Sequence, residues 1–340
     1  LLDYDQKRRS DVVRCLSLDD GRDIWRYAYP VTVKRNHGMS RTVPTVTDRH
    51  VVTLGPKCHV TCLARQDGTL RWAIDLVRDY GATVPPWYAG QCPIIDENRA
   101  ILAPGGTGTL MVAIECETGV VAWRTPNPRG WKMSHSSILP ISFAGRRYYV
   151  YTANGGIAVV DAATGALVWD SNTWRINIAA VPTPVFVPPD RLLFTGGYNA
   201  GCMMFQIVVR DGTIALEPSY RRGPEVFGSD QQTPVWYRGF VYGVRPGGQL
   251  VCFDPAGSVR WISDAKYKFG LGPYLVADGK LLVLDDNGML GMFLAQPESC
   301  APLGAAQVLD GHDAWGPMAI ADGLLVCRDL TRLVCLNLKK

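Results

Sequence analysis

Three observations in the sequence predict an all-β fold, an eight-bladed β-propeller of four-stranded antiparallel blades. A hairpin pattern returns with a period of about 47 residues. A proline opens an apolar run about 25 residues before each hairpin turn. The turns at one end of the repeat are short, whereas the loops at the other end are long and polar. A period in the forties made of strands and turns is typical of propeller blades.

The hairpin is clearest at Ile157–Trp169, which reads IAVVDAATGALVW. An apolar run with a carboxylate, a Thr-Gly turn and a second apolar run ending in Trp indicate two short antiparallel strands. Further copies span residues 15–25, 62–72, 113–123 and 252–261. In all five copies the Trp lies four residues after the turn glycine. The glycines are Gly21, Gly68, Gly119, Gly165 and Gly257, and the tryptophans are Trp25, Trp72, Trp123, Trp169 and Trp261.

These tryptophans have a structural interpretation. A Trp side chain buries about 150–250 Å², so five of them at equivalent places are expected to wedge between adjacent blades. A degenerate sixth copy turns at Gly212 and has Leu216 in the place of the Trp. Met289–Leu294 and Arg332–Leu338 fall where the seventh and eighth copies of the first hairpin strand are expected.

The proline-led runs are the expected inner strands. Proline lacks the N–H that a strand donates, so sheets admit it at edges and at strand starts, and the innermost strand of a blade is an edge. The seven prolines are Pro44, Pro93, Pro140, Pro184, Pro234, Pro273 and Pro317. Seven inner strands and eight third strands favour eight blades over seven blades closed by an overlap. Residues 1–340 then form a single domain that begins inside blade 1 and ends inside blade 8, with the missing strands expected in a longer precursor.

The figure AxDxxTGxxxW, best preserved at Val159–Trp169, resembles the tryptophan docking repeat of PQQ-type propellers. That superfamily includes quinoprotein alcohol dehydrogenases and the non-catalytic BamB-like outer-membrane assembly lipoproteins. The resemblance covers nearly the whole chain and implies the fold. It leaves the function open, because one fold hosts both enzymes and scaffolds. WD40 and kelch propellers match less well, since neither of their repeat signatures recurs.

Composition narrows the class of protein. The net charge is +4 with both signs interspersed, so no basic tract argues for nucleic acid, and no apolar run reaches transmembrane length. With the resemblance, we expect a periplasmic or secreted protein whose export signal lies upstream of Leu1. Among ten cysteines, Cys15, Cys62, Cys252 and Cys335 share one place in the repeat. We expect buried or free thiols there, without a disulfide ladder or a metal site.

The long loops carry the candidate binding residues. Loops on a rigid scaffold carry function disproportionately, and two loop classes of a propeller emerge on the same face. Their mix of cations, amides and aromatics suits another protein or a small anionic, planar ligand; the alternative is that the loops only plug the channel. The candidates are Arg35, His37, Arg41, Trp87, Tyr88, Gln91, Trp131, Lys132, His135, Asn199, Gln231, Gln232, Arg245, His312 and Trp315.

Enzyme motifs are missing from the sequence. It contains no GxSxG, HExxH or GxxxxGK[ST], and the glycine-rich segment Ala103–Leu110 leads into a strand where a phosphate loop needs a helix. The quinoprotein resemblance implies PQQ between a Trp and a vicinal disulfide, with calcium held by Glu and Asn beside a catalytic Asp. This chain has no adjacent cysteines. Glu225, Asn199 and Asp230 could be offered for the calcium and base positions, without a motif to support them.

The leading hypothesis is therefore a non-catalytic PQQ-like propeller that acts as a scaffold or binding module through the long-loop face of its central channel. No catalytic residue and no metal ligand is assigned. A PQQ-dependent alcohol or sugar dehydrogenase, with PQQ and calcium as cofactors, is the first alternative. A propeller subunit of a larger membrane-bound or electron-transfer complex is the second.

Overall fold

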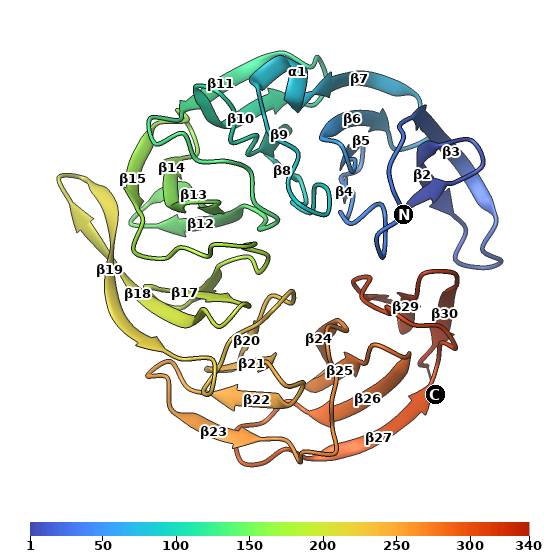
Figure 1. Cartoon of the computed structure of the whole chain (residues 1–340), viewed down its shortest axis with the longest axis vertical. Coiled ribbons are helices and arrows are strands. Elements are labelled where there is room, and N and C mark those ends of the chain that lie inside the picture. The colour runs from blue at the N-terminus through green and yellow to red at the C-terminus, as the bar shows by residue number, and fades with distance from the viewer. Residues whose placement is uncertain (340) are drawn as a thin grey trace. The chain divides into compact units, whose positions relative to one another are not determined.

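The computed structural model describes residues 1–339, and its strands form eight antiparallel sheets, the blades of an eight-bladed β-propeller. The prediction of an all-β propeller with eight blades is confirmed (Figure 1). Six sheets have four strands and two have three. The chain divides into two compact units: unit 1 is Leu1–Pro184 with Val208–Leu216, and unit 2 is Val185–Ile207 with Glu217–Lys340. That residues 1–340 form a single domain stays a prediction.

Unit 1 holds the first four sheets in chain order. The first has β1 (Leu2–Asp5), β2 (Ser10–Leu16) and β3 (Asp23–Pro30). The second has β4 (Thr45–Val46), β5 (His50–Leu54), β6 (His59–Ala64) and β7 (Leu70–Asp75). The third has β8 (Ile94–Asp96), β9 (Arg99–Leu102), β10 (Thr109–Glu115) and β11 (Val121–Pro126). The fourth has β12 (Leu139–Phe143), β13 (Arg146–Ala153), β14 (Gly156–Asp161) and β15 (Leu167–Ser171).

The remaining sheets lie in unit 2, except for the tip of the β18–β19 hairpin. The fifth has β16 (Val185–Val187), β17 (Arg191–Gly196), β18 (Gly201–Arg210) and β19 (Thr213–Arg222). The sixth has β20 (Val235–Tyr237), β21 (Phe240–Val244), β22 (Leu250–Phe253) and β23 (Val259–Ile262). The seventh has β24 (Tyr274–Ala277), β25 (Lys280–Leu284), β26 (Met289–Leu294) and β27 (Pro302–Gln307), and the eighth has β28 (Ala319–Ala321), β29 (Leu324–Arg328) and β30 (Leu333–Asn337).

The five hairpins that end in a repeat tryptophan, called here the docking hairpins, have the same irregularity in the register of their strands. Val159 lies opposite Trp169, and the pairing shifts by one residue directly afterwards. The same shift follows the pairs Cys15–Trp25, Cys62–Trp72, Ala113–Trp123 and Cys252–Trp261. Such a bulge bends the strand and increases its twist. The turn glycine beyond it has a φ between 72° at Gly21 and 82° at Gly257, a backbone region that glycine enters without strain.

Trp25, Trp72 and Trp123 of unit 1 each join one sheet to the next. The Trp25 Nε1 donates to the Arg65 carbonyl at 2.9 Å, and the Trp123 Nε1 donates to the Ala162 carbonyl at 3.2 Å. Each indole also covers the turn glycine of the following sheet, so a Cβ on Gly68 would lie 2.5 Å from the Trp25 ring. The sequence pattern therefore encodes an aromatic ring and the glycine under it, one repeat apart.

The fifth sheet departs from the prediction. Strands β18 and β19 each extend over ten residues, and it is Tyr220 that lies over the next turn glycine, 2.8 Å from a Cβ on Gly257. The prediction that Leu216 takes the place of the Trp is therefore wrong. The hairpin is longer than its relatives, so its docking aromatic comes further from Gly212 along the chain.

Most of the proline-led runs are inner strands as expected. Pro44, Pro93, Pro184, Pro234 and Pro273 each stand immediately before an inner strand. Pro140 is instead the second residue of β12, which is tolerated because β12 is the edge of its sheet. Pro317 precedes β28 by two residues.

All ten cysteines are free thiols. Cys62 and Cys252 are buried, as predicted for small apolar side chains in the third strand. Cys335 is exposed, which corrects the prediction for that position. It lies on β30, which is an edge strand within residues 1–339, so the described part of the eighth sheet leaves it uncovered.

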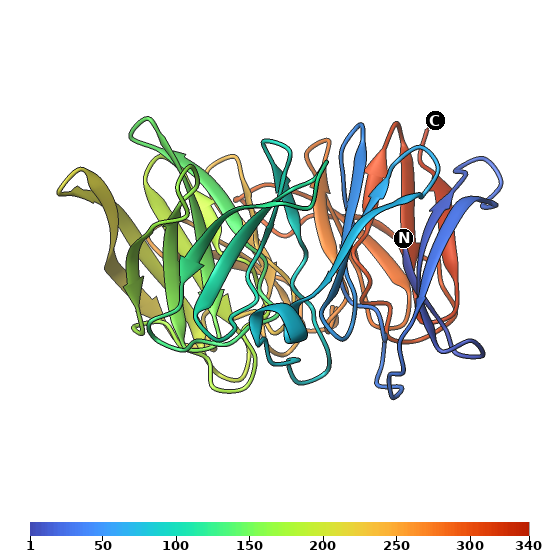
Figure 2. The same ribbon diagram turned by 90° about the horizontal axis from the view of Figure 1, so that it is seen from above.

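One short helix was not anticipated. Helix α1 (Leu76–Tyr80) begins after Asp75, whose carboxylate accepts from the N–H groups of Val77 and Arg78, and it ends at Gly81 in the left-handed region. Leu76 and Tyr80 bury their side chains in the core of unit 1. In Figure 2 the helix leaves the lower edge of unit 1, the same edge as the blue loop that follows β3. The helix thereby fixes the start of the loop over residues 81–92.

Candidate functional site

A chain of hydrogen bonds joins the loops that precede the inner strands of unit 1. The Val43 N–H donates to the Cys92 Sγ at 3.2 Å, the Cys92 N–H to the Ser137 Oγ at 3.0 Å, and the Ser137 N–H to the Thr183 Oγ1 at 3.3 Å. Each of these residues stands two positions before its inner strand. The loops over residues 31–43, 81–92 and 127–138, named here the loop face, are thus held to one another at their bases.

The tip of the middle loop is an unusual turn. Trp87 and Tyr88 are consecutive, and their φ angles are 61° and 75°. A non-glycine residue in this region costs about 1–2 kcal/mol, so the surrounding contacts must hold the turn. The Tyr88 N–H donates to the Pro85 carbonyl at 3.1 Å and the Ala89 N–H to the Pro56 carbonyl at 3.0 Å. This turn leaves Trp87 41 % exposed.

The first loop clamps the same turn from the other side. The Tyr88 hydroxyl accepts from the Lys34 N–H at 2.7 Å and donates to the Lys34 carbonyl at 3.1 Å. A single phenol therefore satisfies both backbone groups of one residue in the loop over residues 31–43.

The third loop contributes His135, which is buried. Its Nε2 donates to the Pro86 carbonyl at 2.8 Å, and its ring centroid lies 6.4 Å from that of Trp87. Burial lowers the pKa of His135, and the positive charge of Arg41 lowers it further, against the opposing effect of the Pro86 carbonyl. His135 is accordingly a neutral hydrogen-bond donor beneath the Trp87 turn.

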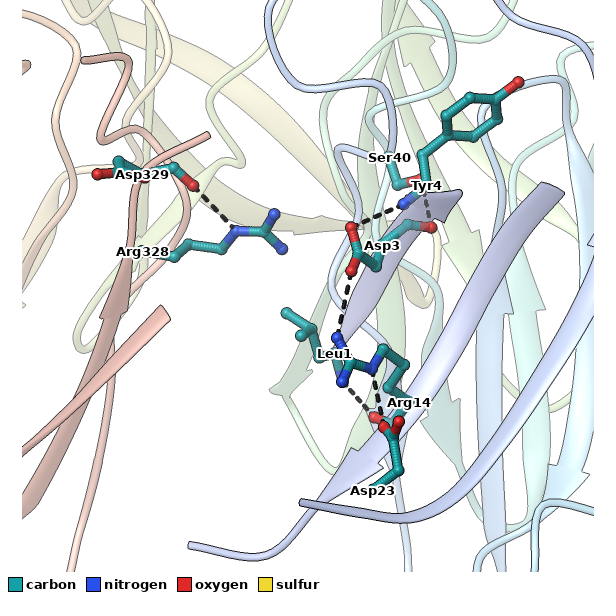
Figure 3. Close-up of polar contacts among 8 residues, drawn as sticks. All are labelled: Leu1, Asp3, Tyr4, Arg14, Asp23, Ser40, Arg328 and Asp329. Atoms are coloured by element: carbon teal, nitrogen blue, oxygen red, sulfur yellow. Dashed lines mark hydrogen bonds and ion pairs between the residues drawn. The ribbon is translucent and has the colours of Figure 1, made fainter. Parts of the chain in front are cut away.

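Ser40, near the end of the first loop, donates to the Asp3 carbonyl of the first sheet at 3.5 Å, as Figure 3 shows. The Asp3 carboxylate accepts from the Tyr4 N–H at 2.8 Å and pairs with Arg14 at 3.4 Å, and Arg14 pairs with Asp23 at 2.8 Å. Ser40 donates to the buried carboxylate of Asp11. A cavity of about 160 Å³ lies beside this loop and is lined by Tyr4, Gln6, Arg9, Thr32, Val33, Arg35 and Met39.

A second cavity, of about 290 Å³, lies on the fourth sheet. It is lined by Arg129, Trp131, Asn154, Gly155, Asn172 and Arg175. Arg129 is held by Asp170, with its Nη2 2.7 Å and its Nε 3.2 Å from the two carboxylate oxygens. Lys132 is exposed next to it, and its carbonyl accepts from the Asn154 N–H at 3.0 Å. Guanidinium and amide groups of this kind recognise carboxylates.

Several predicted binding residues turn out to hold the loops together. Gln91 is fully buried, and its amide accepts from the Ala103 N–H at 2.9 Å and donates to the Tyr151 hydroxyl at 3.2 Å. Trp131 is buried too, and Gly155 and Gly156 cover its ring, so that a Cβ on Gly155 would lie 2.4 Å from it. Backbone thus covers part of this indole, and the ring also lines the cavity of about 290 Å³.

The remaining candidates of unit 1 lie in the first loop. Arg41 donates from its Nη2 to the Asn36 carbonyl at 2.6 Å, which folds the loop back on itself. His37 has a φ of 53°. Arg35 lines the smaller cavity.

Among the predicted binding residues of unit 2, some hydrogen-bond to neighbouring loops and others are exposed. Gln232 donates from its Nε2 to the carbonyls of Gly270 at 3.0 Å and Gly272 at 2.9 Å, and the Arg245 guanidinium donates to the Glu225 carbonyl at 3.1 Å. The Trp315 Nε1 donates to the Asp286 carboxylate at 2.6 Å. In contrast, Asn199, Gln231 and His312 are exposed.

The carboxylates offered for calcium and the catalytic base lie beside glycines. The Asp230 carboxylate lies against Gly197, where a Cβ would be 2.3 Å away, and Glu225 folds against Gly223. Nowhere in residues 1–339 do three His, Cys, Asp or Glu side chains gather so that they could hold a metal ion.

Over residues 1–339, no helix has the length and apolar character needed to cross a membrane.

The fold and the docking hairpins define the class of protein, an eight-bladed PQQ-like β-propeller. Residues 9–254 match the model of the family described as outer membrane protein assembly factor BamB. This match spans more than half of the chain, so the chain belongs to that family. It confirms the resemblance that the AxDxxTGxxxW repeat indicates.

Solved structures show the same fold at low sequence identity. BamB from Moraxella catarrhalis is 16 % identical, with 98 % of this chain and 97 % of that chain covered and a TM-score of 0.66. AztD from Citrobacter koseri is 12 % identical, with 96 % and 88 % covered and a TM-score of 0.60. No curated protein matches the sequence. Because 1128 solved chains resemble this structure, the likeness establishes the fold alone. It does not identify an activity, since one fold hosts many functions.

Proposed function

We propose that the protein is a non-catalytic scaffold that binds another protein through the loop face of unit 1. Membership of the BamB family, described by a factor in outer membrane protein assembly, supports a role outside the cytoplasm, in the periplasm or secreted. The proposal assigns recognition to the loops because the docking hairpins are fully used in joining the blades.

The turn at Trp87 and Tyr88 is the observation that carries the proposal. Trp87 is 41 % exposed, although its backbone is strained and is held by three loops. Strain of this kind persists only where the surroundings impose it, and it gathers at functional positions. A large aromatic side chain already fixed in place loses little conformational freedom on binding, and tryptophan is enriched among the residues that dominate interface energies.

The charge around the loop face indicates the chemistry of the partner. Lys132, Arg35 and Arg175 are exposed, and the larger cavity brings Arg175 beside Arg129. A partner surface with carboxylates would be complementary, since such pairs steer the encounter and exclude partners of the wrong charge. We therefore expect the partner protein to present an acidic surface with an apolar region that contacts Trp87.

The experiment compares what co-purifies with three forms of the full chain isolated from its own cells: the wild type, Trp87→Ala and Val120→Ala. Val120 is the control because it is 62 % exposed on the β10–β11 hairpin, away from the loop face. We expect at least one protein to fall about tenfold with Trp87→Ala and to remain with Val120→Ala. A set of co-purifying proteins that is the same for all three forms would overturn the proposal.

Two other readouts separate the alternatives. The protein is incubated with PQQ and calcium while the cofactor's absorbance is recorded, and dye reduction by an alcohol or a sugar is measured. Saturable binding together with turnover would establish a dehydrogenase in place of a scaffold. The native mass of the complex shows whether the protein is a subunit of a larger assembly.

A further inference from the structure

Two buried cysteines from neighbouring sheets of unit 1 meet at one docking tryptophan. Cys62 lies in the middle of β6 and directly opposite Trp72, and Cys116 follows the end of β10. Both side chains are fully buried in the same core cluster, with Trp72 packed against it. They come from the second and third sheets, 54 residues apart in the chain.

The carbonyl of Cys116 is the point of contact. It accepts a hydrogen bond from the Trp72 Nε1 at 2.9 Å and a second one from the Cys62 Sγ at 3.4 Å. The thiol of Cys62 therefore reaches across the boundary between two sheets and points at the residue that carries the other thiol.

The two thiols also interact with each other. The hydrogen bond to Cys116 and burial both raise the pKa of Cys62, whereas the hydrogen bond from Cys62 lowers the pKa of Cys116 against the effect of burial. The two thiols are thus close enough to affect each other's protonation.

Cys252 and Cys58 have different neighbours. Cys252 occupies the repeat position of Cys62, opposite Trp261, and its thiol meets the Tyr242 side chain. The Cys58 Sγ lies 4.0 Å from the thioether sulfur of Met133, which cannot form a disulfide. Within residues 1–339, the thiol of Cys62 donates to the backbone carbonyl of another cysteine, Cys116.

We propose that Cys62 and Cys116 form a redox modification site at which the two thiols join in a disulfide between the second and third sheets. The present structure is the reduced form of this site. The inference is independent of the proposed scaffold function, because it rests on the core of unit 1 and uses no residue of the loop face.

The reaction needs an oxidant of the disulfide class, such as glutathione disulfide or the disulfide of an oxidoreductase. The thiolate of one cysteine attacks one sulfur of that disulfide, which breaks the S–S bond and releases one thiol. The other cysteine then loses its proton, and its sulfur attacks the protein sulfur of the mixed disulfide, which releases the second thiol. The protein loses two protons and two electrons, and the oxidant becomes two thiols.

Burial decides when this reaction takes place. Both side chains are 0 % exposed, so an oxidant reaches them before the two sheets have docked or during a local opening. Oxidation is therefore expected to be fast while the chain folds and slow once it is folded. The bond closes a loop of 54 residues, which restricts the unfolded chain and raises stability.

The experiment refolds the full chain from guanidinium chloride in a glutathione redox buffer and, in parallel, exposes the folded protein to the same buffer. Remaining thiols are alkylated, and the protein is digested and mapped by mass spectrometry without reduction. We expect a peptide linked through Cys62 and Cys116 after refolding, at a level at least about tenfold above that in the protein oxidised when folded. We also expect a thermal midpoint several degrees higher that returns to the reduced value when reductant is added.

Three variants serve as controls. Cys116→Ser and Cys62→Ala should lose the linked peptide and the difference in midpoint between oxidised and reduced samples. Cys252→Ala, at the equivalent repeat position, should retain both. The proposal is overturned if wild-type Cys62 and Cys116 are both alkylated after oxidative refolding, or if either one is found linked to a different cysteine. The wild-type map decides the question even where a variant does not fold.

Discussion

The indole of Trp72 donates to the carbonyl of Cys116 at 2.9 Å and covers Gly119, where an added Cβ would lie 2.9 Å from the ring. One side chain of the second sheet thus depends on a carbonyl and a glycine of the third. The same relationship joins Trp25 to Gly68 and Trp123 to Gly165, so the Trp of one repeat packs on the turn glycine of the next. A substitution of this glycine therefore tests how the blades are joined.

Gly119→Ala should be more damaging than Gly212→Ala. Both glycines have a φ of 74°, but nothing lies within 4 Å of a Cβ on Gly212. Each change costs about 1–2 kcal/mol for the backbone, and Gly119→Ala should add about 1–3 kcal/mol because the Trp72 ring must shift. Urea denaturation of the two variants measures the difference. Equal losses would show that Trp72 does not bear on Gly119.

Gln91→Ala should destabilise the fold by about 3 kcal/mol. Gln91 is fully buried, so its removal leaves the Ala103 N–H without its acceptor, takes one hydrogen-bond donor away from the Tyr151 hydroxyl and opens a cavity. Gln231→Ala, at an exposed position, should change stability by less than about 0.5 kcal/mol. Chemical denaturation of both variants checks this. A Gln91→Ala variant as stable as Gln231→Ala would mean that the amide is not structural.

His135 should make the stability depend on pH. Burial lowers the pKa of His135 in the folded protein below the ordinary value of 6.5, so between these two values the unfolded chain binds more protons. Stability from this residue is present above pH 6.5 and is lost as the pH falls through the folded pKa. Thermal midpoints of the wild type and His135→Gln across this range give the slope. The same slope in both proteins would contradict the assignment.

Tyr88→Phe should loosen the first loop. The phenol pairs with both backbone groups of Lys34, and its loss removes about 1 kcal/mol of local stability. Hydrogen exchange at the Lys34 amide should become about fivefold faster, because that amide opens more often. Tyr198→Phe is a suitable control, since Tyr198 also has a positive φ and is exposed in unit 2. Unchanged exchange at Lys34 would show that the clamp is not needed.

The blades could be predicted from the sequence because their signals are local. A turn glycine followed by a Trp four residues later lies within one hairpin, and apolar runs mark each strand. The fifth sheet escaped this reasoning, since its hairpin is longer and Tyr220 replaces the Trp at another spacing. A fixed spacing cannot detect an aromatic residue that an insertion has moved.

The site was harder to predict, because contacts between loops decide it. Gln91 and Trp131 belong to polar loops and were expected to face a ligand, yet both are buried. Their partners lie in other sheets and leave no mark on the neighbouring residues. Nothing in the segment Pro85–Ala89 indicates that Trp87 and Tyr88 have positive φ angles, since aromatic residues rarely do. The structure was needed to reveal that this turn is held from three sides.

Binding of the partner to Trp87 is the central claim, and one measurement tests it most directly. The protein that is lost from the Trp87→Ala preparation is purified and titrated by calorimetry into wild-type, Trp87→Ala and Val120→Ala protein. We predict a Kd at least about tenfold weaker for Trp87→Ala, which corresponds to about 1.4 kcal/mol, and an unchanged Kd for Val120→Ala. A Trp87→Ala protein that binds its partner as tightly as the wild type would show that Trp87 is not part of the binding surface.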